Sequence, residues 1–150
     1  MLRHARRKVS PEPADAYALD QQVGFRMRVA MQRHTSIFMS AMIEGLTQTQ
    51  FAALAKLLEV GPCSQNQLGR LIYLDAATIK GVVDRLRRRG FVTATADPQD
   101  RRRRAVTLTQ TGERVTRGAV QVASEITAAT LAPLTAAERR EISRLLQKLG

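Results

Sequence analysis

The sequence predicts a mainly helical domain that carries one small β-hairpin. Three observations support this fold class. Apolar residues recur at helical spacing over most of the 150 residues, Ser, Thr or Asp stands where several of these segments begin, and two short alternating segments lie between positions 91 and 108. Apolar residues make up 44 % of the chain, an ordinary share for a globular protein of one domain.

Residues 1–17 begin with basic side chains and are then interrupted by Pro11 and Pro13. Such a segment predicts a flexible basic tail. Two alternatives stay open. The segment could be an arm that adds contacts to DNA phosphates, or an extension that lies across a partner subunit.

Residues 18–45 predict a long first helix that runs from Leu19 to about Met42. One stripe of this helix consists of methionine, histidine and phenylalanine: Met27, Met31, His34 and Phe38. A methionine-rich stripe is typical of an adaptable core. His34 is then either a satisfied, half-buried side chain or a contact to a small ligand.

Residues 46–109 begin with two shorter helices. Thr47 and Gln50 have the spacing of a capping box, which predicts that one helix starts there. Ser64 is expected to cap the next helix, with the Gln67 side chain reaching back to close a second capping box.

A third helix in this region is expected to start after Asp75, a good N-cap, and to stop at Gly90. Its apolar stripe faces inward: Ile79, Val82, Val83 and Leu86. Its opposite face is small and cationic: Ala76, Ala77, Thr78, Lys80, Gly81 and Arg85. Small residues let a backbone approach base edges, and cations reach phosphates or guanine, so this helix is predicted to read DNA.

Two alternating segments, 91–95 and 105–108, predict the strands of a hairpin. The loop between them ends in four consecutive arginines, Arg101 to Arg104, whose charges repel one another. The run is either a solvated loop or a contact to the narrow, negative minor groove. Its place directly after a helix-turn-helix pattern favours DNA contact.

The charge of the chain supports a nucleic-acid partner. The formal net charge is +11, and residues 80–104 hold nine basic groups against three acids, which gives 9 − 3 = +6 for that window. Clustered positive charge is the electrostatic footprint of a DNA-binding protein. A membrane surface is the competing partner, but it favours aromatic anchors, and the chain has no Trp and only 4 % aromatic residues.

The single cysteine, Cys63, excludes a disulfide framework within one chain and suits a reducing compartment. The sequence shows neither a signal peptide nor an apolar run of the roughly 20 residues that cross a membrane. We therefore expect a cytoplasmic protein. It also shows no phosphate-binding loop, nucleophile motif or metal-ligand spacing, so we expect no catalytic residues, metal or cofactor.

Residues 110–150 predict two helices, the second opened by a capping box that Thr135 and Glu138 form. Their apolar stripes are expected to form a dimer interface together with the first helix. The residues assigned to this interface are Val122, Ile126, Ile142, Leu145, Leu146 and Leu149. The alternative is that the stripes pack only within their own chain.

The order helix, turn, helix, hairpin is that of a winged helix-turn-helix, and two motifs resemble the MarR family of bacterial transcription regulators. The family's wing pattern is matched by Asp97, Pro98, Asp100, Arg101, Arg102, Val106, Leu108 and Thr109. The end of its recognition helix is matched by Val83, Asp84, Arg85, Leu86, Arg89 and Gly90. The chain departs from many members at Ala77, where they carry a serine.

The resemblance implies that Asp100 holds Arg102 by a charge-assisted bond and that Arg102 enters the minor groove. It also implies a dimer and an effector cleft beside the first helix. A cleft lined by aromatic, methionine and cationic side chains suits a small aromatic acid or its thioester. The effector contacts assigned on this basis are Arg28, Met31, His34 and Phe38.

We therefore expect a homodimeric repressor that an anionic aromatic effector releases from a palindromic promoter site. The residues assigned to DNA are Ser64, Gln65, Ala76, Ala77, Thr78, Lys80, Gly81, Arg85, Asp100, Arg101, Arg102 and Arg103. Two alternatives remain: a thiol-based redox switch at Cys63, or a basic architectural protein that coats DNA without sequence preference.

Overall fold

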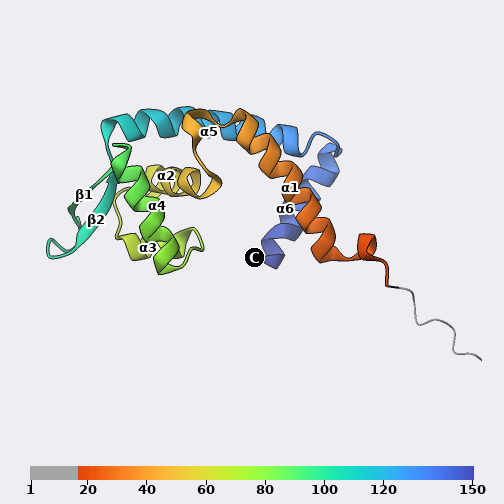
Figure 1. Ribbon diagram of the computed structural model, residues 1–150, viewed down its shortest axis with the longest axis horizontal. Coiled ribbons are helices and arrows are strands. Elements are labelled where there is room, and N and C mark those ends of the chain that lie inside the picture. Colours follow the sequence, from red (N-terminus) through yellow and green to blue (C-terminus); the bar gives the residue numbers. More distant parts are fainter. Residues whose placement is uncertain (1–16) are drawn as a thin grey trace, which may run out of the picture. The chain divides into compact units, whose positions relative to one another are not determined.

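The computed structural model describes residues 17–150, so the expected basic tail lies, except for its last residue, outside the described residues (Figure 1). The described chain forms two units, one ending at Gln32 and one comprising Arg33–Gly150. Each unit is described by itself.

The first unit holds a single 3-10 turn, Leu19–Gln21, and the beginning of helix α1, Val23–Ala41. The apolar pattern predicted that the long helix starts at Leu19, but the helix begins at Val23. The reason is local hydrogen bonding: Arg26 Nε donates to the Asp20 carbonyl at 2.8 Å and Arg26 Nη2 to the Gln21 side chain at 2.7 Å. These bonds hold the chain in a separate turn before the helix.

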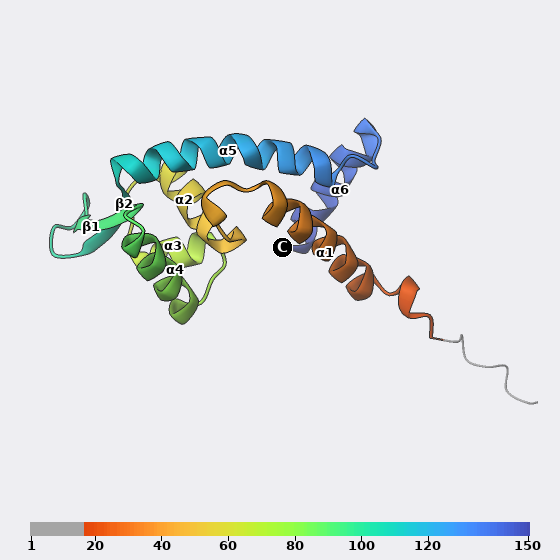
Figure 2. The ribbon, with the colours of Figure 1, turned by 45° about the horizontal axis from the view of Figure 1, so that its top comes forward.

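The second unit contains the rest of α1 and all later elements. Their bounds are η2 Ile43–Gly45, α2 Gln48–Val60, α3 Gln65–Leu71, α4 Ala76–Arg88, β1 Val92–Ala96, β2 Arg104–Leu108, α5 Gln110–Thr130 and α6 Ala136–Leu149. Figures 1 and 2 show α2 running beside α5, the hairpin projecting away from the helices, and α6 at the opposite end of α5 from the hairpin.

The predicted helix caps are present with one exception. Thr47 and Thr135 each form both halves of a capping box, and Asp75 accepts from the Thr78 N–H at 2.7 Å. Ser64 accepts from the Gln67 N–H at 3.1 Å, which is the single hydrogen bond recorded for that cap. The prediction that the Gln67 side chain bonds back to the Ser64 N–H is therefore wrong.

The helix-turn-helix depends on a close approach between α3 and α4. A Cβ on Gly69 would lie 3.0 Å from Ile79 Cγ2 and 3.2 Å from the Leu74 carbonyl oxygen, so a larger residue would push the helices apart. Tyr73, in the turn between the helices, has φ of +59°, a left-handed conformation that is uncommon outside glycine.

The hairpin is antiparallel and pairs Val92 with Leu108 and Ala96 with Arg104. Cys63 adds a short bridge to the outer side of β2, since its N–H and carbonyl both bond to Val106. Burying Val92 and Val106 fixes this sheet against the helices, while the loop beyond Ala96 stays in solvent.

The core of the second unit joins α2, α3, α4, β1, β2 and α5. Its largest fully buried side chains are Leu46, Leu54, Leu68, Ile79, Leu86, Val83, Val92 and Thr116. Ile126, expected at the dimer interface, is 2 % exposed and packs in this core, and Val122 packs against it half-buried. The prediction that Ile126 faces a second chain is therefore wrong.

Helix α6 has no buried residue between Ala136 and Leu149. Its apolar side chains Ile142, Leu145, Leu146 and Leu149 are exposed on a single chain. Contiguous exposed apolar residues are typical of an interaction surface. Among residues 17–150, no helix is long and apolar enough to span a bilayer.

Candidate nucleic-acid interface and ligand pocket

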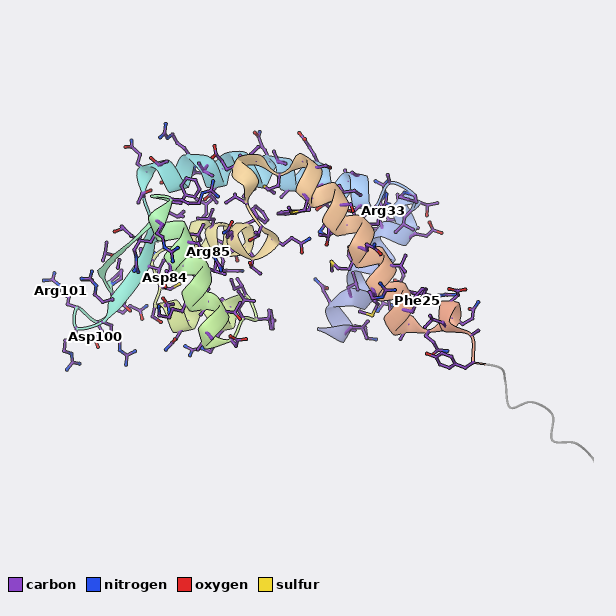
Figure 3. All side chains as sticks on the ribbon, viewed as in Figure 1. Phe25, Arg33, Asp84, Arg85, Asp100 and Arg101 are labelled. Atoms are coloured by element: carbon purple, nitrogen blue, oxygen red, sulfur yellow. The ribbon has the colours of Figure 1, made fainter. Side chains whose placement is uncertain are left out.

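Helix α4 presents a small, cationic surface because its apolar stripe is used by the core. Ala76, Ala77, Thr78, Lys80 and Arg85 are exposed, and Gly81 is half-buried. The Arg85 guanidinium lies over Gly81, with Nη1 at 3.6 Å from the position that a Cβ there would occupy. Figure 3 shows Arg85 on α4. The surface has the size and charge to enter a major groove.

An acid shares this surface. Lys80 Nζ donates to Asp84 Oδ2 at 2.8 Å, and Arg87 Nη1 lies 3.8 Å from the other carboxylate oxygen. The hydrogen bond from Lys80 is the main reason that the pKa of Asp84 is lowered. Sequence reasoning placed Asp84 in a family motif but did not single it out. The spacing of four residues from Lys80 was the available signal.

The hairpin loop is organised by Asp100. Its carboxylate accepts from the Arg102 backbone N–H at 3.1 Å and from Arg102 Nε at 3.2 Å, which confirms the bond that the family resemblance implied. Arg103 Nε lies 3.7 Å from the same carboxylate. The bond from the Arg102 side chain is the largest cause of the lowered pKa of Asp100. Figure 3 shows Asp100 and Arg101 together at the loop.

The hydrogen bonds leave much of the loop's positive charge available. The Arg102 side chain is 91 % exposed although its Nε is fixed by Asp100. A guanidinium that is oriented at its base and exposed at its tip loses little freedom when it binds an anion. Ser64 and Gln65 are half-buried at the start of α3, where the Ser64 hydroxyl oxygen already accepts the capping bond.

The start of α5 is tied directly to the end of α4. The Thr109 hydroxyl donates to the Gly90 carbonyl at 2.6 Å and accepts from the Gly112 N–H at 3.0 Å. A Cβ on Gly112 would overlap the Phe91 carbonyl oxygen. Sequence reasoning missed this junction, for which the Thr-x-x-Gly spacing was the only local signal.

A pocket of about 220 Å³ lies between the last turns of α1, helix α2 and helix α5. It is lined by His34, Phe38, Gln48, Phe51, Ala123, Ile126 and Thr127. His34 Nδ1 lies 2.8 Å from the Thr130 hydroxyl, and the Gln48 amide donates to the Thr35 hydroxyl at 3.2 Å. The pocket combines aromatic walls with a few oriented polar groups, which is typical of a small-molecule site.

Two of the four predicted effector contacts, His34 and Phe38, meet at this pocket. Arg28 and Met31 belong to the first unit, where Arg28 lies over the Phe25 ring at 5.2 Å and Met31 is 55 % exposed. The pocket residues Gln48, Phe51 and Thr127 were missed because they come from helices distant in sequence.

Arg33 is not a free cation at this end of α5. Its guanidinium donates to the Thr130 carbonyl at 2.6 Å and to the Ala129 carbonyl at 3.0 Å. Carbonyls at a helix C-terminus lack partners within the helix, so Arg33 completes the end of α5.

Cys63 is 5 % exposed, and burial raises the pKa of its thiol, with a smaller contribution from the charge of Asp97. A thiol acts as a nucleophile through its thiolate. A position just before a helix N-terminus can lower the pKa of a thiol, but the pKa of Cys63 is raised. The environment of Cys63 therefore weighs against a redox switch.

A helix-turn-helix with a basic, acid-organised hairpin defines a winged-helix DNA-binding protein. The model of the MarR family matches residues 46–103. The chain is also 39 % identical to the HTH-type transcriptional repressor NicR of Pseudomonas putida over 134 residues, 89 % of this chain and 85 % of the relative. The chain belongs to the MarR family, and it is a transcription regulator.

Solved structures of bacterial proteins are similar to this chain. A probable transcriptional regulator from Pseudomonas aeruginosa is 47 % identical with a TM-score of 0.85, covering 89 % of this chain and all of its own. Bordetella bronchiseptica BpsR is 38 % identical with a TM-score of 0.82, covering 89 % of this chain and 96 % of its own. That structure concerns the regulation of BpsR DNA binding by 6-hydroxynicotinic acid.

Proposed function

We propose that this MarR-family regulator is a homodimeric repressor that leaves its promoter when a small aromatic acid binds the His34–Phe51 pocket. The observation that carries the proposal is the presence, in one unit, of a cationic reading surface and a separate aromatic pocket. The unit that holds both is residues 33–150.

The DNA-binding surface is assigned to α4 and the wing. In α4 the contacts are Ala76, Ala77, Thr78, Lys80, Gly81 and Arg85, with Ser64 and Gln65 at the start of α3. In the wing they are Arg101, Arg102 and Arg103, with Asp100 as their anchor. Helix α4 enters the major groove and Arg102 the adjacent minor groove, where phosphates of both strands are close together.

The dimer is assigned to α6, whose apolar row Ile142, Leu145, Leu146 and Leu149 is exposed on a single chain. A two-fold dimer presents two reading surfaces, which match the two halves of an inverted repeat.

The effector is assigned to the class of single-ring aromatic acids that includes hydroxylated pyridine carboxylates. A pocket of about 220 Å³ is small for a ligand site, which favours a single ring. Phe38 and Phe51 supply ring contacts, and His34, Gln48 and Thr127 supply polar contacts. The similarity to BpsR and its 6-hydroxynicotinic acid supports this class.

Release requires that the effector binds the DNA-incompetent state more tightly than the DNA-competent state. A coupling free energy of roughly 1–3 kcal/mol between the two sites weakens DNA binding about 5- to 150-fold. The opposing reading surfaces then no longer match the spacing of the half-sites.

The DNA assignment is tested by competition between the DNA upstream of the protein's own gene and a random duplex of the same length. The parent is expected to prefer its own promoter by about 10³ or more at fixed salt, and a basic architectural protein would show no such preference. Arg102→Ala is expected to weaken promoter binding and to flatten the salt slope by about one. Arg140→Ala, which removes an exposed arginine of α6, is the matched control.

The effector assignment is tested by titrating 6-hydroxynicotinic acid and benzoic acid into the protein–promoter complex. Gln48→Met removes one polar group from the pocket and is expected to weaken the effective acid about 5- to 150-fold, the effect of losing a hydrogen bond of roughly 1–3 kcal/mol. Gln121→Met makes the same chemical change on the exposed side of α5 and should leave release unaltered. Release of DNA by peroxide, with no effect of either acid, would favour Cys63 instead.

A further inference from the structure

The outward face of α4 carries a carboxylate, which cannot attract the phosphates of DNA. With about 100° of rotation per residue, Asp84 lies about 140° around the helix from the buried Ile79. It shares this side with Ala77, Lys80 and Gly81. A carboxylate there repels phosphates on every duplex. Its presence therefore calls for a role other than attraction to DNA phosphates.

The contacts of Asp84 indicate what that role is. Asp84 accepts from Lys80 Nζ at 2.8 Å, and its side chain is 30 % exposed while that of Lys80 is 67 % exposed. The ammonium therefore keeps one donor on Asp84 and its other donors in solvent. A lysine paired in this way must give up its bond to Asp84 before its ammonium can turn to a phosphate.

Helix stability does not explain the pair. An exposed ion pair of this kind contributes little, and a lysine placed before its acid is the less favourable order along a helix. The cap at Asp75 and the buried stripe hold α4 independently of it.

We propose that Asp84 is a specificity-determining residue, an internal counterion that holds Lys80 at a base edge and away from phosphates. On random DNA the tied lysine makes no phosphate contact, while on the promoter its free donors reach an acceptor such as guanine O6 or N7. This inference rests on the proposed binding of α4 to DNA.

The test compares Asp84→Asn with the parent on the upstream DNA of its own gene and on random duplex. Freeing Lys80 is expected to tighten random binding at least about threefold and to steepen its salt slope by about one, as for one added phosphate contact. Promoter binding should change less, so that the specificity ratio falls. Glu59→Gln is the matched control, because it removes the acid of a lysine pair of similar length, 2.9 Å, on α2.

Lys80→Gln removes the same ion pair by changing its lysine. It is the variant to use if Asp84→Asn lowers the melting temperature. It is expected to weaken promoter binding about 5- to 150-fold, the loss of a base contact of roughly 1–3 kcal/mol, with little effect on random DNA. The two variants thus lower the specificity ratio for opposite reasons.

Three results would overturn the inference. If Asp84→Asn raised the affinity for both duplexes equally, the change would be a simple charge effect. A loss on the promoter with no gain on random DNA would mean that Asp84 itself accepts from a base, such as cytosine N4. If Lys80→Gln lowered the affinity for both duplexes equally, Lys80 would be an ordinary phosphate contact. A parent without promoter preference is a separate outcome, since it contradicts the proposed function itself.

Discussion

Arg89, directly after α4, meets Glu44 in η2, the turn that follows α1. Arg89 Nη2 donates to the Glu44 carbonyl at 2.6 Å and lies 3.5 Å from its carboxylate, and the guanidinium stacks over the Phe91 ring at 4.6 Å. Glu44 has φ of +57°, a left-handed conformation that is uncommon outside glycine. One side chain therefore connects η2, the end of α4 and Phe91, the residue before β1.

Arg89→Gln is expected to lower the free energy of unfolding by about 1–2 kcal/mol, because a hydrogen bond to a charged donor and a cation–π contact are lost together. Urea denaturation followed by circular dichroism measures the change. Arg87→Gln, which removes an arginine with one weak ion pair, should stay within about 0.5 kcal/mol of the parent. Equal losses in the two variants would contradict the role given to Arg89.

Gly112→Ala is expected to destabilise the protein by about 1–3 kcal/mol or to prevent folding, since the new methyl group would overlap the Phe91 carbonyl. Gly118→Ala on the same helix meets only the flexible end of Ile43, at 3.2 Å, and should be close to neutral. Thermal unfolding of the two variants checks the difference. A Gly112→Ala protein as stable as the Gly118→Ala protein would show that the junction with Phe91 is looser than described.

Stability is expected to fall in acid partly through Asp75. Its pKa is lowered from the ordinary value of 3.8, mainly by the hydrogen bond from the Thr78 N–H. A lowered pKa in the folded state stabilises the fold above the unfolded-state value, and this contribution is lost as pH falls through the folded-state value. Asp75→Asn keeps a capping oxygen but should remove part of the pH dependence below about pH 4.

Asp75→Ala is the companion variant, because it removes both the cap and the titrating group. It should lower the melting temperature at neutral pH as well as in acid. Urea midpoints at a series of pH values separate the two cases. An Asp75→Asn protein with the parent's full loss of stability in acid would place that loss on other carboxylates, such as Asp84 and Asp100.

Cys63 is expected to react slowly with a thiol reagent in the native protein, because it is buried and its pKa is raised. Reaction with Ellman's reagent should become fast only in denaturant. Cys63→Ser should also respond to the effector as the parent does. Rapid modification of the native thiol, or loss of DNA binding upon mild oxidation that Cys63→Ser prevents, would restore the redox alternative.

The double variant Leu145→Lys/Leu149→Lys is expected to be monomeric at concentrations where the parent is dimeric, since two charges would enter the apolar row of α6. Sedimentation velocity measures the change. Val60→Lys, at an exposed apolar position of α2, is the control and should keep the parent's mass. An unchanged mass for the double variant would exclude α6 from the dimer interface.

The sequence by itself determined the local features of this protein. Helix caps at Thr47, Asp75 and Thr135 were predictable because each depends on residues three positions apart, and the hairpin strands were predictable from their alternating pattern. The Asp100–Arg102 bond followed from the resemblance of the loop to the family's wing motif. The apolar stripe of α4 likewise defined which face was left for DNA.

Only the tertiary structure decided which distant residues meet. It placed Gln48 and Thr127 beside His34, turned Ile126 into the core instead of toward a second chain, and buried Cys63. Periodicity identifies an apolar face but not the surface that covers it, since several helices of this chain carry an apolar face. Their partners are selected by packing between whole helices, and that information is spread over the entire chain.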